Sequence, residues 1–387
     1  MAGAHAGRTM NYRFASLTPD DEAAVVLHLL ALDDEDRALR FGGATADATL
    51  IAYARGLNFN RDVAEGAWDG GRLVGFAHLA VHVEDGYPVG ELGLSVLPGH
   101  RDRRIGGVLL EKAILRARRY RLTRLDVHYM RRNLAMTRLV RRFGLDVDYD
   151  GDEATGRLPV VPRAASVRTE VGRGGRDGRL EVFRNLPCGR AKGHVLLVHG
   201  AGGDGWQWRA VMADLAAAGY AAHALSLSGH GRSAPARPSF AQLFDDVRSV
   251  LETLPDDTRL VGHSLGGYLV QRELAESQRP AAVLLAPVPP EVPRDGDLAL
   301  LMAGVSGRRT REVVASVLTD AAPVAVDRVT TPVSLISGDR DRVMPVPWMR
   351  ATAQRYRAPW TRLAAGHNLP VAQGVSAPLR EGLRLSA

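Results

Sequence analysis

The sequence predicts an α/β protein of two domains, and three observations support this prediction. The chain has 387 residues, which is long for one domain. Residues 151–164 are polar, contain Pro159 and Pro162, and lack hydrophobic periodicity, as expected of a linker. On either side of it, apolar segments with strand and helix periods alternate. We therefore expect one domain over residues 10–150 and a second over residues 165–387.

The composition excludes several classes of protein. Cys188 is the only cysteine, so no internal disulfide can form, which favours a reducing compartment. No apolar run approaches the roughly 20 residues that span a bilayer, and the N-terminus has no apolar signal-peptide core. Histidines, cysteines and carboxylates show no metal-ligand spacing. We expect a soluble cytoplasmic protein with no metal and no membrane partner, and the oligomeric state stays open.

The net charge of +7 comes from arginine, because Lys112 and Lys192 are the only lysines. Arginines crowd residues 101–142, which suits a phosphate-bearing ligand or a nucleic acid. No helix-turn-helix, zinc-ligand or RNA-binding motif accompanies them. We therefore expect no nucleic-acid partner.

The first domain mixes helices and strands. Hydrophobic periods and capping residues predict helices from Asp20 or Asp21 to Leu32, from Asp47 to Leu57, around Leu110–Ala117, and from Asn133 to about Phe143. Alternation and turn residues predict strands over Arg72–Val83, Glu91–Val96 and Leu125–Tyr129.

A turn rich in arginine and glycine joins the second of these strands to a helix. It contains Arg101, Arg103, Arg104, Gly106 and Gly107. Unpaired N–H groups and the helix dipole converge at such a turn, which makes it an anion site.

This half resembles the GNAT-type N-acetyltransferases, whose Arg/Gln-x-x-Gly-x-Gly/Ala turn holds the pyrophosphate of coenzyme A. The resemblance implies acyl-CoA as co-substrate, bound by the turn and by the helix that opens at Asn133. In one register Arg101 and Gly106 match and Arg104 takes a glycine position, where a positive φ would cost on the order of 1 kcal/mol. In the other register Arg103 and Gly106 match and Val108 does not.

Besides this mismatch in the turn, the sequence departs from the family pattern at a residue that takes part in the reaction. Many members of this family protonate the thiolate leaving group with a tyrosine on the last helix, and here Val140 takes that position. Glu91 is a candidate general base, with a solvated strand-end glutamate as the alternative. We expect acyl-CoA binding and leave the transfer reaction and the acceptor amine open.

The second domain begins with a hairpin over residues 167–183 and then alternates strands with helices. Such alternation predicts a parallel sheet covered on both faces, with ligands beyond the carboxyl ends of the strands. The predicted strands are His194–Val198, Ala222–Leu227, Arg259–Val261, Ala281–Leu285, Val333–Ser337 and Thr361–Ala364.

Three chemically active residues follow strand ends in this half. Ser264 lies in a Gly-x-Ser-x-Gly turn, where Gly262 and Gly266 leave room for a strained nucleophile elbow. Asp341 and His367 follow two later strands. This order resembles the α/β-hydrolases, near the esterase and lipase branches. Asp339 is the alternative acid, but the family's Gly-x-x-Asp spacing points from Gly338 to Asp341.

The resemblance implies a role for each residue. Ser264 attacks an acyl carbon, His367 moves the proton, and Asp341 orients the imidazole. The N–H groups of Leu265 and Ala201 are expected to stabilise the oxyanion. An insertion over residues 287–329 is expected to form a short helical lid, whose apolar side chains either line the pocket or pack the lid down.

The sequence thus predicts a serine hydrolase of a small-molecule carboxylic ester, joined to a GNAT-like domain that binds acyl-CoA, and leaves open whether this domain transfers the acyl group to an amine. The alternative is a thioesterase or amidase that a non-catalytic, CoA-sensing first domain regulates.

Overall fold

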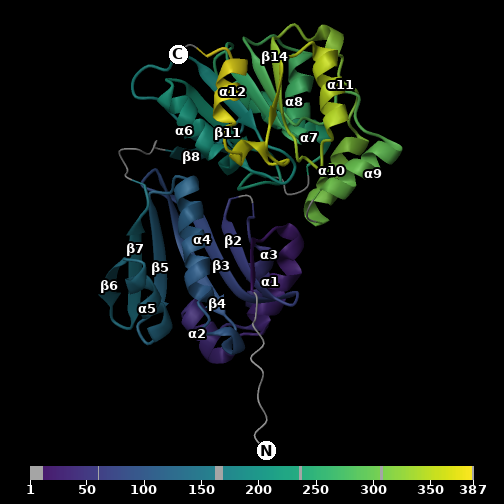
Figure 1. Cartoon of the computed structure of the whole chain (residues 1–387). Coiled ribbons are helices and arrows are strands. Elements are labelled where there is room, and N and C mark those ends of the chain that lie inside the picture. Colours follow the sequence, from purple (N-terminus) through teal and green to yellow (C-terminus); the bar gives the residue numbers. More distant parts are fainter. Residues whose placement is uncertain (1–11, 60, 162–168, 235–237, 306–307, 386–387) are drawn as a thin grey trace, which may run out of the picture. The chain divides into compact units, whose positions relative to one another are not determined.

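The computed structural model describes residues 12–59, 61–161, 169–234, 238–305 and 308–385. Their contacts divide the chain into two compact units (Figure 1). The first contains the described residues of 1–84 and 88–162, and the second contains those of 85–87 and 163–387. The ends of the predicted linker and of the predicted first domain, at 162–164 and 10, lie outside the described residues, as do residues 167 and 168 of the predicted hairpin. Each unit is described here by itself.

The first unit is built on a seven-stranded sheet with the order β1-β2-β3-β4-β5-β7-β6. β4 and β5 run parallel, whereas β1–β2, β2–β3, β5–β7 and β6–β7 are antiparallel. The strands are β1 (Arg13–Ser16), β2 (Val63–Asp69), β3 (Arg72–Glu84), β4 (Tyr87–Val96), β5 (Arg124–Met130), β6 (Asp146–Asp150) and β7 (Glu153–Pro159).

Helices cover this sheet (Figure 1). α4 packs on β2 and β3 through Leu109, Leu110 and Ala113, which are buried and recur at helical spacing. α1 packs on β3 and against α3. The helices are α1 (Glu22–Leu30), α2 (Asp34–Phe41), α3 (Asp47–Arg55), α4 (Ile105–Arg119) and α5 (Leu134–Arg142), with the 3₁₀ turns η1 (Pro19–Asp21) and η2 (Pro98–His100).

Part of the predicted linker, residues 151–164, is a strand instead. Glu153–Pro159 forms β7, which pairs with β5 on one side and β6 on the other. Its inward positions are Ala154 and Gly156, and Gly156 lies against Leu145 and Val140. Because small residues occupy the buried positions, the strand has no hydropathic alternation, and the sequence pattern looks like a linker.

β4 and β5 separate at the middle of the sheet. They pair in parallel from Val89–Arg124 to Glu91–Asp126. Beyond that point, Leu92–Val96 of β4 and His128 and Tyr129 of β5 line one pocket of about 550 Å³. The divergence of two parallel strands thus opens the sheet to a ligand.

The second unit has an eight-stranded sheet with the order β15-β14-β13-β12-β10-β11-β9-β8. Its centre is parallel, and β8 and β9 form an antiparallel hairpin that pairs with β11. The strands are β8 (Thr169–Gly174), β9 (Leu180–Asn185), β10 (His194–Val198), β11 (Ala221–Ser226), β12 (Arg259–His263), β13 (Ala282–Leu285), β14 (Val333–Gly338) and β15 (Trp360–Leu363). The central strands are buried on both faces, as the predicted parallel sheet requires.

The helices of this unit lie on both faces of its sheet (Figure 1). α6 and α12 contact each other, and α7 contacts α8. The predicted insertion contains α9 and α10. The helices are α6 (Arg209–Ala217), α7 (Phe240–Leu251), α8 (Leu265–Leu274), α9 (Asp295–Gly304), α10 (Arg308–Thr319), α11 (Val346–Tyr356) and α12 (Ser376–Gly382), with 3₁₀ turns η4 (Gly205–Trp208), η5 (Val326–Arg328) and η6 (Leu369–Val371).

Within the described ranges, no helix has the length and apolar character needed to cross a bilayer.

Candidate active site

Ser264 lies on a strained turn between β12 and α8. Its backbone has φ 54° and ψ −119°, a combination that non-glycine residues rarely adopt. The glycines two residues away on each side have no room for a side chain. A Cβ on Gly262 would lie 2.5 Å from the Gly266 carbonyl oxygen, and a Cβ on Gly266 would lie 2.3 Å from the His199 carbonyl oxygen. The sequence-predicted elbow therefore has the backbone strain and the close packing that its glycines indicate.

Ser264, His367 and Asp341 form one chain of hydrogen bonds. The Ser264 Oγ lies 3.1 Å from His367 Nε2, and His367 Nδ1 lies 2.9 Å from Asp341 Oδ2. Since the carboxylate can only accept, we assign the ring proton to Nδ1, which leaves Nε2 free to accept the serine proton. Three side chains from the ends of β12 and β14 and from the loop after β15 meet at this point.

The environment of Asp341 favours its ionised form. Burial raises the pKa of this carboxyl, but the hydrogen bond and charge of His367 and the N–H groups of Met344 and Val343 together bring the pKa below its ordinary value. Both N–H groups donate to Oδ1, at 2.9 and 2.8 Å. The carboxylate thus has a fixed orientation toward the imidazole.

The other aspartate in this loop has different partners. Asp339 Oδ1 accepts from Arg362 Nε at 2.7 Å in an exposed ion pair. Of the two predicted alternatives, Asp341 is the one in contact with His367.

Two backbone N–H groups suit the stabilisation of an anion beside Ser264. Leu265 begins α8, so its N–H has no acceptor one turn back within the helix. After β10, the Gly203 N–H donates to the Gly200 carbonyl at 3.0 Å and closes a turn. Ala201 is the second residue of this turn, so the hydrogen bond of the turn does not involve the Ala201 N–H. This turn is adjacent to the serine, because a Cβ on Gly200 would lie 3.0 Å from Ser264 Cβ.

Three further histidines support the loops around Ser264. His199 Nδ1 donates to the Gly200 carbonyl at 2.7 Å, and His230 Nε2 donates to the Ala201 carbonyl at 2.7 Å. His263 Nε2 donates to the backbone carbonyl of His367 at 2.9 Å. Burial lowers the pKa of His263 to about 3 and that of His199 well below its usual range, so both rings are neutral near pH 7. All three rings donate to backbone carbonyls and so hold the loops around the serine in place.

The predicted lid contacts both sides of the serine. Thr310 of α10 lies over Gly202 in the turn after β10, and the end of α9 at Gly304 packs on Arg342 and Val343 beside Asp341. Of the lid's apolar side chains, Leu301, Val314 and Val317 are buried, whereas Leu300 is 50% exposed. Some of these side chains therefore pack the lid down.

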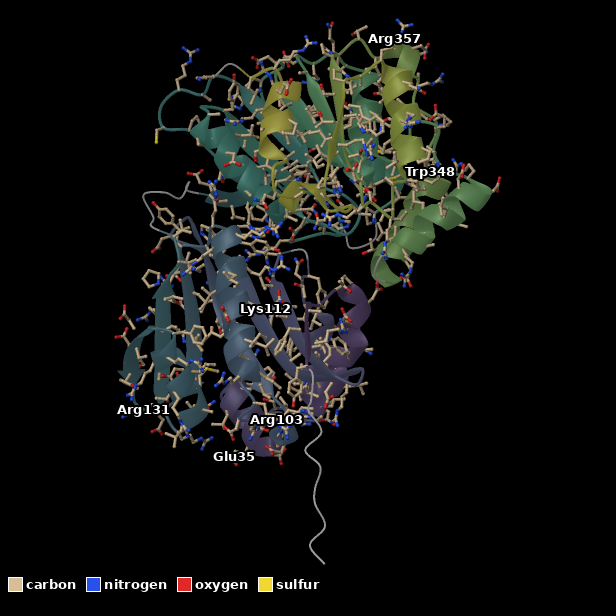
Figure 2. The ribbon with its side chains drawn as sticks, in the orientation of Figure 1. Glu35, Arg103, Lys112, Arg131, Trp348 and Arg357 are labelled. Carbon is tan, nitrogen blue, oxygen red and sulfur yellow. The ribbon has the colours of Figure 1, made fainter. Side chains whose placement is uncertain are left out.

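The first unit holds a second candidate site, the pocket of about 550 Å³ between β4 and β5, here called the α4 pocket. Five of the six predicted cofactor-binding residues line it: Arg101, Arg104, Gly106, Gly107 and Asn133. Arg103 is not in its lining; Figure 2 marks this exposed side chain on the turn before α4.

The residues of the α4 pocket fit an anionic ligand. A Cβ on Gly107 would meet nothing within 4 Å, and Ile105, Gly106 and Gly107 line the pocket, so the first turn of α4 borders it. Arg104 has φ 64°, a left-handed conformation, which is the strained case considered for the register that places Arg104 at a glycine position. Arg101 instead pairs with Asp36 and donates to the Val96 carbonyl at 3.2 Å. Arg40 of α2 and two arginines of α5, Arg138 and Arg142, also line the pocket, and Asp36 and Asp102 are its two carboxylates.

The structure also places three other residues that the sequence singled out in this unit, namely Asn133, Val140 and Glu91. The Asn133 side chain accepts from the Met136 N–H at 3.0 Å and caps α5. Val140 is fully buried. Glu91 is exposed and lines a neighbouring pocket of about 400 Å³, here called the acceptor pocket. Buried Tyr129 lines both pockets and was not singled out from the sequence, because no motif marks it.

Among the described residues, no group of three or more histidine, cysteine or acidic side chains is arranged to hold a metal ion.

Comparisons with known proteins match the two halves to two families. Residues 16–145 match the model of the acetyltransferase (GNAT) family, and residues 195–380 match that of the alpha/beta hydrolase family. Over 82 residues the chain is 39% identical to Methylesterase 3 of Arabidopsis thaliana, covering 20% of this chain and 31% of that protein. Over 107 residues it is 36% identical to Salicylic acid-binding protein 2 of Nicotiana tabacum, covering 25% and 40%.

The chain thus spans well under half the length of these relatives. Among solved structures, the thioesterase domain from the curacin biosynthetic pathway is similar over 56% of this chain and 99% of that one, at 17% identity and a TM-score of 0.45. The predicted fold class, a GNAT-like fold followed by an α/β-hydrolase fold, is confirmed.

Proposed function

Because the chain joins a GNAT acetyltransferase domain to an alpha/beta hydrolase domain, we propose that the second domain is a serine hydrolase that cleaves a carboxylic ester. The observation that carries this proposal is the hydrogen-bonded chain of Ser264, His367 and Asp341, with distances of 3.1 and 2.9 Å. A hydroxyl within reach of an oriented imidazole is the minimum that nucleophilic acyl transfer requires.

The proposed mechanism follows from these contacts. Ser264 Oγ attacks the ester carbon while His367 Nε2 takes its proton, and Asp341 stabilises the imidazolium. The N–H groups of Leu265 and Ala201 bind the oxyanion, and each such donor is typically worth about 3 kcal/mol of barrier. His367 then returns the proton to the leaving alcohol, and water hydrolyses the acyl-enzyme by the same route.

The name of one relative suggests the substrate class. Methylesterase 3 is named for methyl esters, so we propose a small methyl ester of a carboxylic acid as the substrate.

For the first domain we propose acyl-CoA binding in the α4 pocket, with the first turn of α4 and Arg104 facing the pyrophosphate. When bound, acyl-CoA would supply an activated thioester. The exposed, single Cys188 supports a reducing, cytoplasmic setting.

The alternative function keeps the serine site but assigns it a thioester or amide, with the first domain as a CoA sensor. The buried Val140 favours this alternative, since it occupies the position of the family's leaving-group tyrosine.

Turnover by the full chain distinguishes these functions. We expect hydrolysis of a p-nitrophenyl ester and of a methyl ester, little release of thiol from acetyl-CoA by the serine site, and loss of ester turnover in Ser264→Ala. Release of thiol that exceeds ester turnover and also disappears in Ser264→Ala would favour the thioesterase. Calorimetry with CoA tests the α4 pocket separately, in wild type and in Arg104→Ala.

A further inference from the structure

The acceptor pocket of the first domain adjoins the α4 pocket. Six residues line both, so a thioester in the α4 pocket would be open to a group in the acceptor pocket. The shared residues are Leu39, Arg40, Leu92, Gly93, His128 and Tyr129.

A chain of hydrogen bonds leads from the acceptor pocket into the core. The Tyr53 hydroxyl lies 2.6 Å from His78 Nδ1, and His78 Nε2 lies 3.1 Å from Asp62 Oδ2. Because the carboxylate accepts, Nε2 carries the ring proton and Nδ1 accepts from Tyr53. Asp62 Oδ1 accepts the Val81 N–H at 2.9 Å, which fixes the carboxylate. In this series of hydrogen bonds, Tyr53 therefore donates to His78, and His78 donates to Asp62.

His78 and Asp62 are the inner two residues of this series of hydrogen bonds. Burying their polar side chains costs free energy that apolar side chains at these positions would not. His78 and Asp62 are each 7% exposed, and the His78 ring stacks on Phe76 at 3° between the ring planes. Burial raises the pKa of Asp62, but the hydrogen bonds of His78 and Val81 outweigh it, so this pKa lies below its ordinary value. A buried carboxylate that orients an imidazole is the arrangement that general bases use.

Tyr53 connects the pair to the pocket. Tyr53 and His78 both line the pocket, and Tyr53 is half-buried. Arg40 donates to the Tyr53 oxygen at 3.0 Å, so this hydroxyl accepts from a cation while it donates to His78. Burial raises the pKa of Tyr53 above its ordinary value, and the charge and hydrogen bond of Arg40 offset part of this rise. Tyr53 is therefore a neutral hydroxyl that accepts one proton as it passes on another, and the guanidinium stabilises the negative charge that develops on its oxygen.

We propose that Tyr53, His78 and Asp62 form a proton relay that deprotonates the acyl-accepting nitrogen of a primary amine in the acceptor pocket. This inference rests on the proposed acyl-CoA role of the first domain. The amine nitrogen attacks the thioester carbon, the C–N bond forms, and the C–S bond breaks. The nitrogen loses a proton to Tyr53 as Tyr53 passes its own to His78. For the free amine, the proton that reaches His78 returns to solvent and the departing thiolate takes up one, so the overall reaction consumes and releases none. An amine that binds as ammonium releases one further proton to solvent before it attacks.

The pocket lining suits an amine with an apolar body. Phe41, Tyr53 and Tyr129 supply aromatic surface, and Glu91 and Glu153 supply negative charge. The glutamates attract an ammonium group, and the aromatic faces bind both a cation and an apolar body. Glu91, the candidate base predicted from the sequence, is on this view a binding residue.

The test uses the full chain carrying Ser264→Ala, which removes any thioester hydrolysis by the second domain. Acetyl-CoA is the donor, and 2-phenylethylamine, tyramine and spermidine are the acceptors. Release of thiol is followed from pH 6 to 9 in Tyr53→Phe, His78→Gln and Asp62→Asn. His82→Gln is the matched control, because His82 lies four residues further along β3 and is half exposed. CoA affinity by calorimetry reports whether each variant is folded.

We expect at least one amine to accelerate thiol release. Tyr53→Phe and His78→Gln should lower kcat/KM for the amine by about 10²-fold or more, with CoA affinity unchanged. Asp62→Asn should also move the acid limb of the pH profile to lower pH, because an imidazole without its carboxylate is protonated less readily. The other charged groups that face the relay are Arg40, Arg61 and Glu91. Glu91→Gln should raise KM and leave the limb unchanged.

Three results would overturn the relay. One is CoA binding with no acceleration by any of the amines. Another is a pH limb that disappears in Glu91→Gln but persists in His78→Gln. The third is wild-type turnover in Tyr53→Phe. Absence of CoA binding would overturn the proposed role of the first domain together with the relay, and would leave the ester hydrolase untouched.

Discussion

Asp341 and Asp339 lie two residues apart in one loop, yet only Asp341 contacts His367. Asp341→Asn keeps the shape of the side chain but removes its charge and favours the wrong imidazole tautomer. We therefore expect kcat for a p-nitrophenyl ester to fall by about 10³- to 10⁴-fold. Asp339→Asn loses only an exposed ion pair with Arg362 and should retain wild-type kcat. Equal losses of kcat in the two variants would contradict the assignment of Asp341 as the acid of the triad.

The sequence singled out the residues that the structure brings together around Ser264, whereas in the acceptor pocket it singled out Glu91 but not the residues of the relay. Ser264, Asp341 and His367 each follow a strand within a short recognisable motif. Tyr53 and His78 come from α3 and β3, and only the tertiary fold brings them together. Periodicity reports which face a residue occupies, but not which polar groups meet across elements.

At the scale of single elements, the nucleophile elbow depends on its glycines. A Cβ on Gly266 would lie 2.3 Å from the His199 carbonyl oxygen and 2.4 Å from that of Val198. Gly266→Ala must move backbone, so we expect it to lower the free energy of unfolding by about 3 kcal/mol or more and to abolish ester turnover. Gly296→Ala is the control, because its Cβ would meet nothing within 4 Å at an α9 position. Urea denaturation that gives equal stabilities for the two variants would contradict this account.

Arg104, at the start of α4, has a strained backbone conformation and also lines the α4 pocket. Arg104 has φ 64°, so Arg104→Gly should raise the free energy of unfolding by about 1 kcal/mol. It should also weaken CoA binding, since a guanidinium that lines the α4 pocket is lost. Arg121 has φ 53° and lines neither pocket, so Arg121→Gly should give a similar gain in stability without loss of CoA affinity. Thermal denaturation and calorimetry check both; unchanged affinity in Arg104→Gly would exclude this arginine from the binding site.

The sequence prediction missed five elements of the first unit, namely β1, β2, β6, β7 and α2, and three of them for identifiable reasons. α2 has no buried residue, so it shows no apolar stripe. β2 buries Glu65 beside Arg116, at 3.2 Å, which breaks the hydropathic alternation of the strand. β7 buries only small residues. β10 and α4 were predicted because β10 is a continuous apolar run and the apolar residues of α4 recur at helical spacing.

At the scale of the whole molecule, buried neutral histidines make both units sensitive to acid. Burial lowers the pKa of His28 and of His223 to about 4. The unfolded chain therefore binds more protons than the folded one between about pH 6.5 and 4. Each histidine's contribution to stability is complete above pH 6.5 and is lost as the pH falls to 4, and it amounts to up to about 3 kcal/mol.

Urea denaturation at pH 7 and pH 5 checks this dependence. We expect the wild-type chain to lose stability at the lower pH and His223→Gln to lose less. The same pH dependence in both would contradict the assignment of His223 as a buried neutral group.

The account as a whole depends on one chemical property, the nucleophilicity of Ser264, and a fluorophosphonate label measures it directly. The intact mass of the labelled chain and the modified peptide should show one adduct, located on Ser264. Labelling should be slower in Asp341→Asn and absent in Ser264→Ala. A wild-type chain that remains unlabelled, or an adduct on another serine that persists in Ser264→Ala, would contradict the proposed hydrolase.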